Sequence, residues 1–245
     1  MRLNVISLER TPERLAQFRQ RNAHLSDVIA FRATDGLQLS RHDLVAQGFI
    51  SAPEVNYTAG ALGCMMSHSA LWARAAETGE ITTICEDDAI IKLDFERLAL
   101  GVIAALPDHT DIIYWGFNFD AKMAIEPIAG VLPCTTCFGR NLLPSEIESF
   151  QRDTSVPIPV RLLRAFGIVC YTITPKGAKR LRQLCIPIRS EVWEFSEIGL
   201  RIANMGIDVA MANALPQLTA YCSFPPLAVS LNDPQQSTIQ TRQES

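Results

Sequence analysis

The chain has 245 residues, of which 48% are hydrophobic and 20% charged, and its formal net charge is −4. This composition is typical of a globular α/β protein and excludes a largely disordered chain. The negative charge argues against a nucleic-acid partner. No run approaches the roughly 20 apolar residues of a membrane span, and the N-terminus lacks the apolar core of a signal peptide. We therefore expect a cytoplasmic protein.

Apolar periodicity predicts strands and helices that alternate along the chain, as in an α/β fold. The expected strands are residues 3–8, 28–33, 81–85, 111–117, 166–174 and 207–212. The expected helices are residues 12–24, 59–78, 95–106, 175–184 and 190–204. Residues 37–57 show little periodicity, and we expect a partly helical loop region there.

Cap and turn residues support several of these ends. Pro12 and Pro175 are suited to a first helical position, and Gly79 is suited to the residue after a helix. Ser190 predicts an N-cap, after which Glu191 and Glu194 would be favoured in the first turn by the helix dipole.

Residues 120–160 are rich in Pro, Gly, Ser and Thr, and we expect a long functional loop there. Cys134 and Cys137 in this segment have the spacing of half a zinc site or a redox pair. The sequence has no second Cys-x-x-Cys or His pair to complete such a site, so the motif is a weak signal. Four other cysteines lie in core-like surroundings and are expected to be buried thiols: Cys64, Cys85, Cys170 and Cys185. We expect one domain over residues 1–231 and a flexible tail over 232–245.

Three consecutive acids, Glu86, Asp87 and Asp88, follow the apolar run 81–85. In open α/β sheets, ligands bind at the carboxyl ends of the strands. Neighbouring carboxylates repel and raise one another's pKa unless a cation neutralises them. A hard divalent ion holding a substrate phosphate is a common reason for such a cluster. The alternative is an ordinary polar turn.

Four segments, in this order and spacing, carry a resemblance to a known family. They are residues 4–10 (NVISLER), 33–36 (ATDG), 63–68 (GCMMSH) and 86–89 (EDDA). The series resembles glycosyltransferase family 25, the bacterial lipopolysaccharide-biosynthesis glycosyltransferases. The resemblance is dense over about residues 3–95 and looser beyond.

The resemblance implies a GT-A-type fold, in which a Rossmann-like mixed sheet is flanked by helices in a single domain. It also implies an inverting hexosyltransferase that uses UDP-galactose and Mn²⁺, or Mg²⁺. The acceptor would be a glycan or a lipid-linked oligosaccharide, and the enzyme would act at the cytoplasmic face of the membrane. Peripheral contact with that membrane is an open alternative.

By similarity to GT-A enzymes, Asp88 is expected to bind the metal directly, with Glu86 on the ribose or on a metal-bound water and Asp87 able to replace either. The expected nucleotide-binding residues are Ser7, Leu8, Arg10, Asp35, His68 and Asp87. Alternatives stay open for four residues: a solvated charge for Arg10 and Arg14, a plain turn for Asp35 and a core hydrogen bond for His68. Trp72 is expected in the core.

Inverting transfer needs a carboxylate that takes the proton of the acceptor hydroxyl. Family members commonly have an acid soon after a proline in this part of the chain, and this chain has Arg189 there. Glu191 is therefore the first candidate for the base, Glu194 the second and Glu197 the third, with favourable helix-terminal charge as the alternative. Trp193 would stack on an acceptor sugar or anchor the core.

Two other functions compete with the transferase. A metal-dependent hydrolase or phosphotransferase usually has an aspartate nucleophile or a glycine-rich loop after its first strand, and residues 7–10 offer neither. A non-catalytic protein that binds nucleotide sugars or glycans would explain Arg189.

Overall fold

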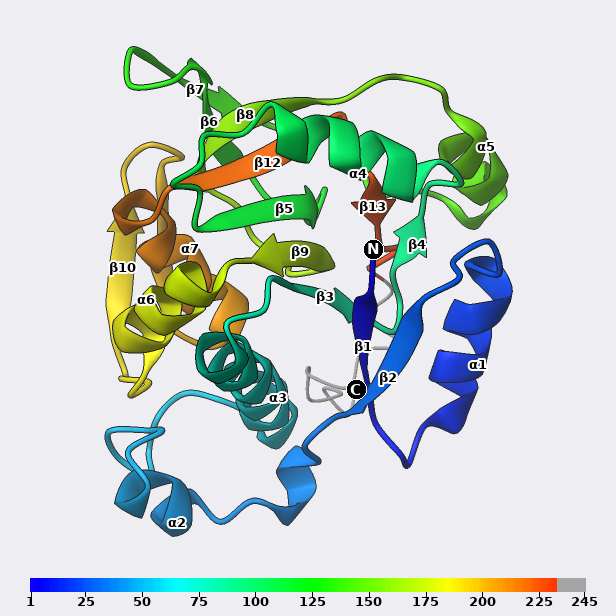
Figure 1. Ribbon diagram of the computed structural model, residues 1–245. Coiled ribbons are helices and arrows are strands. Elements are labelled where there is room, and N and C mark those ends of the chain that lie inside the picture. Colours follow the sequence, from blue (N-terminus) through cyan, green and yellow to red (C-terminus); the bar gives the residue numbers. More distant parts are fainter. Residues whose placement is uncertain (233–245) are drawn as a thin grey trace.

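A computed structural model of the chain describes residues 1–232. It shows one mixed α/β domain in which helices cover both faces of a nine-stranded sheet (Figure 1), so the predicted fold class is confirmed. The predicted tail, apart from Asn232, lies outside the described residues.

In spatial order, the strands of the sheet are β2 (Val28–Arg32), β1 (Leu3–Ser7), β3 (Thr82–Glu86), β9 (Cys170–Ile173), β5 (Ile112–Gly116), β12 (Ala220–Phe224), β8 (Ile158–Arg164), β6 (Met123–Ile128) and β7 (Leu132–Thr136). Strand β1 runs parallel to β2 and β3, and β5 runs parallel to β12. Strand β9 is antiparallel to both of its neighbours. Two small sheets pair β10 (Val192–Phe195) with β11 (Leu200–Ala203), and β4 (Ile90–Ile91) with β13 (Ala228–Val229).

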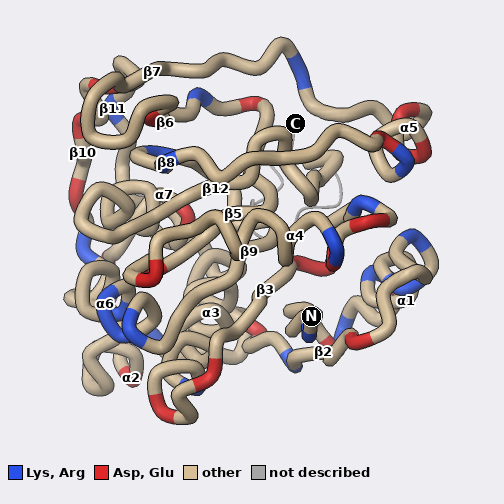
Figure 2. The backbone as a smooth tube through the Cα atoms, turned by 45° about the horizontal axis from the view of Figure 1, so that its top comes forward, with Lys and Arg blue, Asp and Glu red and all other residues tan. Residues whose placement is uncertain are grey.

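The helices are α1 (Pro12–Arg21), α2 (Arg41–Ala46), α3 (Ala59–Thr78), α4 (Phe95–Ala104), α5 (Ile147–Arg152), α6 (Pro175–Cys185) and α7 (Ile207–Ala214), with short 3₁₀ turns η1 (Gly36–Gln38), η2 (Pro144–Glu146) and η3 (Leu215–Gln217). Within the described part of the chain, no helix is long and apolar enough to cross a bilayer. In the view of Figure 2, charges of both signs are spread over the molecule, with basic residues gathered on α1 and α6.

Strand residues alternate between two cores because successive side chains of a strand point to opposite faces. Ile84 and Tyr114 pack with α3, α6 and α7, whereas Cys85 and Trp115 pack with α1 and α4. Both faces of the central strands are therefore buried, which explains their continuous apolar runs.

Helix α3 begins and ends where the sequence predicts. The Thr58 hydroxyl accepts a hydrogen bond from the Ala61 N–H at 3.1 Å, and Gly79 closes the helix at a φ of 74°. Gly63 lets η1 approach, since a Cβ at this position would lie 2.5 Å from the Thr34 carbonyl oxygen. The first half of α3 is thereby held close to the loop that follows β2.

Three predicted segments are wrong. Residues 190–204 form the hairpin β10–β11 rather than a helix: Trp193 and Phe195 turn inward while Val192 and Glu194 are exposed, and Gly199 turns at a φ of 62°. Residues 207–212 belong to helix α7 rather than a strand, because a short apolar run does not distinguish the two. The expected loop at 120–160 contains β6, β7, α5 and the start of β8. The other predicted strands and helices are present, several with shorter ends.

Candidate active site

A cavity of about 560 Å³ opens at the carboxyl ends of β1 and β3. These strands are parallel and in register, with Ile6 opposite Glu86, so the residues that follow them meet at one edge of the sheet. Further parts of the wall come from α1, the loop after β2, the segment before α3 and its first half, the segment before β9, the start of α7 and residues 230–232.

Most of the residues predicted for metal and nucleotide binding line this cavity: Leu8, Arg10, His68, Glu86, Asp87 and Asp88. Ser7 and Asp35 are not part of the lining. Ser7 is buried in β1. Asp35 caps η1 by accepting from the Leu37 N–H at 3.1 Å and pairs with Arg10 at 3.0 Å, so it orients a residue that does line the cavity.

The three glutamates expected to supply the base lie outside the cavity lining, on or beside the β10–β11 hairpin. Glu191 and Glu194 are exposed, and Glu191 accepts a hydrogen bond from the Trp193 indole at 3.0 Å. Glu197 pairs with Arg164 at 3.3 Å. The helix predicted for residues 190–204 is absent, because the segment folds as strands.

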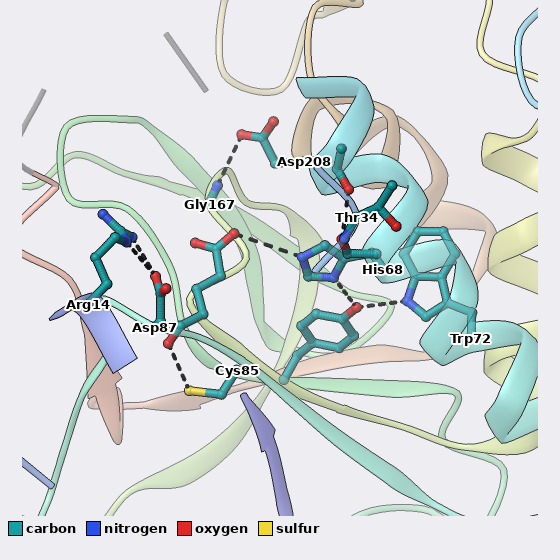
Figure 3. Close-up of polar contacts among 12 residues, drawn as sticks. Arg14, Thr34, His68, Trp72, Cys85, Asp87, Gly167 and Asp208 are labelled. Atoms are coloured by element: carbon teal, nitrogen blue, oxygen red, sulfur yellow. Dashed lines mark hydrogen bonds and ion pairs between the residues drawn. The ribbon is translucent and has the colours of Figure 1, made fainter. Parts of the chain in front are cut away.

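Asp87 is committed to an ion pair. The guanidinium of Arg14 donates to the same carboxylate oxygen from Nε at 2.8 Å and from a terminal nitrogen at 2.5 Å (Figure 3). Both side chains are largely buried. Arg14 is therefore not a solvated surface charge, and it partly neutralises the acidic triplet.

The other two acids of the triplet carry raised pKa values. Burial raises the pKa of Glu86 to about 7, and the neighbouring Asp87 adds to the increase. Burial also raises the pKa of Asp88 to about 6, with Glu86 as a second cause. One Asp88 oxygen accepts from the Ser230 hydroxyl at 3.0 Å, whereas Oδ1 is buried and has no hydrogen-bond partner among the described residues. A divalent cation would satisfy that oxygen and stabilise both charges.

His68 lines the cavity and is also anchored in the core. Its Nδ1 shares a hydrogen bond with the Tyr171 hydroxyl at 2.8 Å, and the Trp72 indole donates to the same oxygen at 2.7 Å (Figure 3). Burial lowers the pKa of His68 to about 3, so the ring is neutral. Its Nε2 faces Glu86 Oε1 at 3.8 Å. Trp72 is fully buried, as predicted.

Asp208 is a carboxylate of the cavity that the sequence analysis missed. It lies in the first turn of α7, and its Oδ2 accepts from the Gly167 N–H at 3.4 Å (Figure 3). Burial raises the pKa of Asp208. Gly206, followed by an acid in the first turn of an apolar segment, is a helix-start signal that points to this residue.

The cysteines differ in burial. Cys85, Cys170 and Cys185 are buried and free, as predicted, and so is Cys222, whereas Cys64, also expected to be buried, is half-buried at the cavity wall. Cys134 and Cys137 are exposed, and in residues 1–232 they belong to no cluster of three metal-ligating side chains.

Two comparisons with known proteins show the family of the chain. The sequence model of glycosyltransferase family 25 (LPS biosynthesis protein) matches residues 1–195. A glycosyltransferase 25 family member of Anopheles gambiae is 32% identical over 186 residues, which cover 72% of this chain and 28% of that relative. The aligned segment is thus little more than a quarter of the relative's length. With a match over most of its residues, the chain belongs to glycosyltransferase family 25.

Proposed function

We propose that this chain is a metal-dependent inverting glycosyltransferase. It moves a hexose, for which galactose is the first candidate, from a UDP-sugar to a lipopolysaccharide or another glycan acceptor. The observation that carries the proposal is the pair Glu86 and Asp88, held with raised pKa values in a cavity at the carboxyl edge of the sheet. The cavity volume falls within the range of about 300–1,000 Å³ that small-molecule sites occupy.

Glu86 and Asp88 suit Mn²⁺ or Mg²⁺, because hard cations prefer carboxylate oxygens. The unpartnered Asp88 Oδ1 supports this assignment, since a buried carboxylate oxygen without a donor is otherwise costly. When bound, the ion would neutralise charge that develops on the departing diphosphate. The Ser230 hydroxyl orients Asp88 toward this role.

Arg10 and His68 supply the remaining contacts to the donor. Asp35 holds the Arg10 guanidinium at the cavity wall. The planar N–H donors of that guanidinium suit a phosphate. The neutral, fixed His68 ring offers a donor or an acceptor without adding a charge beside the metal site.

Asp208 is the proposed base in place of Glu191 and Glu194. Asp208 lies in the cavity lining, whereas Glu191 and Glu194 do not, and its raised pKa favours accepting a proton. The acceptor hydroxyl oxygen forms a bond to the anomeric carbon, the bond from that carbon to the diphosphate breaks, and the hydroxyl proton passes to Asp208. The Gly167 N–H fixes the carboxylate.

The test measures release of nucleoside diphosphate from a panel of sugar nucleotides, with Mn²⁺ and a glycan acceptor library. We expect turnover with one donor. A loss of about 100-fold or more is expected in Asp208→Asn, since a general base contributes roughly 10²–10⁴-fold, and a similar loss in Asp88→Asn, since a bound metal ion stabilises transition-state charge by several kcal/mol. Glu191→Gln is the matched control and should stay within about twofold of wild type. Loss of turnover in Glu191→Gln but not in Asp208→Asn would return the base to the hairpin.

The second candidate is a protein that binds nucleotide sugars without turnover. Arg189, which stands where family members commonly have an acid, is its support. Because Arg189 is exposed and outside the cavity lining, the substitution leaves Glu86, Asp88 and Asp208 in place. Metal-dependent donor binding without turnover across the acceptor library would favour this candidate.

A further inference from the structure

Three side chains with different donor atoms converge on one wall of the cavity. Cys64 and His68 are four residues apart on α3 and therefore share a face of the helix. Glu86 reaches the same point from the end of β3. A ligand atom of each residue, namely a sulfur, a ring nitrogen and a carboxylate oxygen, lies within 4.8 Å of the other two.

The His68 ring is presented to this point as a ligand would be. It is fully buried, yet its Nε2 has no hydrogen-bond partner in the described part of the chain and lies 3.8 Å from Glu86 Oε1. Its other nitrogen is fixed by the Tyr171 hydroxyl, which Trp72 orients in turn. A bond to the second ring nitrogen is what orients most metal-ligating histidines.

The donor set selects the kind of ion. Thiolate and imidazole favour Zn²⁺, whereas Mn²⁺ and Mg²⁺ favour oxygen alone. Ligand bonds of about 2.0–2.3 Å in a tetrahedral zinc site place the ligand atoms roughly 3.3–3.8 Å apart. The present spacing of up to 4.8 Å exceeds this by at most about 1.5 Å, and rotations of the Cys64 and Glu86 side chains would close the difference.

We propose that Cys64, His68 and Glu86 form a Zn²⁺ site whose fourth position opens to the cavity. On binding, the Cys64 thiol loses its proton to solvent, and the neutral His68 donates Nδ1–H to the Tyr171 oxygen so that Nε2 is free to coordinate. This site is distinct from the oxygen-only pair, although both use Glu86. If the proposed function holds, Zn²⁺ withdraws Glu86 from that pair and inhibits transfer.

The test uses Co²⁺ as a spectroscopic substitute for Zn²⁺. The protein is the full chain with Cys134→Ser and Cys137→Ser, which removes the exposed thiols as rival ligands, in a phosphine reductant. We expect one equivalent of Co²⁺ to give a thiolate charge-transfer band and intense visible bands of a tetrahedral site, both abolished by Zn²⁺. X-ray absorption of the zinc form should show one sulfur ligand.

Matched variants locate the site. Cys64→Ser should abolish the charge-transfer band, and Cys185→Ser, which changes a buried thiol outside the cavity lining, should retain it. His68→Gln and Glu86→Gln should each weaken Zn²⁺ affinity by at least tenfold. Near-UV circular dichroism confirms that each variant is folded. Absence of the band in the folded parent protein, or its persistence in Cys64→Ser, would overturn the proposal.

An activity measurement separates this proposal from the proposed function. We expect Zn²⁺ to inhibit the Mn²⁺-supported reaction of the wild type, with an apparent affinity that matches the Co²⁺ competition. Cobalt binding with no transfer under any condition would contradict the transferase and leave the zinc site standing. Transfer without cobalt binding would contradict the zinc site and leave the transferase standing.

Discussion

Glu86 is a carboxylate held where burial disfavours its charge. Its pKa in the folded protein is about 7, above the ordinary value of 4.5, so the folded state binds the proton more tightly than the unfolded state does. This carboxylate therefore lowers the free energy of unfolding as pH rises from about 4.5 to about 7, and its full destabilising effect is present above that window. The residue that causes this loss of stability is one proposed to bind the metal.

Replacing Glu86 with Gln removes that charge. With a chelator present, we expect the free energy of unfolding of Glu86→Gln at pH 8 to be about 1–3 kcal/mol higher than that of wild type. One pKa unit corresponds to about 1.4 kcal/mol, and partial contact of Glu86 with cavity water reduces the effect. At pH 4.5 the two proteins should be nearly equal. Urea unfolding at both pH values measures this, and an identical difference at both would contradict the assignment.

At the scale of elements, close packing of α3 against η1 depends on Gly63. A Cβ at Gly63 would lie 2.5 Å from the Thr34 carbonyl oxygen and 2.7 Å from the Gly36 nitrogen. By contrast, Gly101 on the exposed face of α4 has no atom within 4 Å of such a Cβ. Helix propensity favours alanine over glycine at both positions. Comparing Gly63→Ala with Gly101→Ala therefore separates the effect of helix propensity from the effect of packing.

We expect Gly63→Ala to destabilise the protein by about 1–3 kcal/mol, because overpacking against backbone cannot be relieved by a rotamer change. Gly101→Ala should stabilise it by about 0.5–1 kcal/mol. Thermal and urea unfolding measure both. Because α3 carries Cys64 and His68, Gly63→Ala should also weaken ligand binding in the cavity, and stabilisation by Gly63→Ala would show that η1 moves freely.

Elements with strong local signals were predictable, and those without were not. Helix α3 has a long run of apolar residues at helical spacing and a terminal glycine, so its extent was predicted. Helix α7 is short and apolar on most sides because the sheet and α6 bury it, which gives the same pattern as a strand. The misassigned α7 and hairpin explain why Asp208 was missed and Glu191 was chosen.

At the scale of the whole molecule, the site depends on contacts between distant parts of the chain. The acidic triplet at the end of β3 was predictable because one local pattern contains both the strand and the acids. Asp208 reaches the cavity only after the chain has passed through β9 and the hairpin, and Ser230 only after it has also passed through β12. No local pattern specifies that β12 inserts between β5 and β8, and so the far wall of the site was not predicted.

This arrangement makes a prediction about the fragment of residues 1–195, the segment matched by the family's sequence model. Without β12, the strands β8, β6 and β7 lose their link to β5, and the core loses Met211, Leu215 and Cys222. We therefore expect the fragment to show no cooperative urea unfolding and no near-UV circular dichroism, whereas the full chain unfolds in one transition. A cooperatively folded fragment would mean that the sheet is completed by another pairing. In that case the cavity would lack Asp208, and donor binding without transfer would be the expected activity.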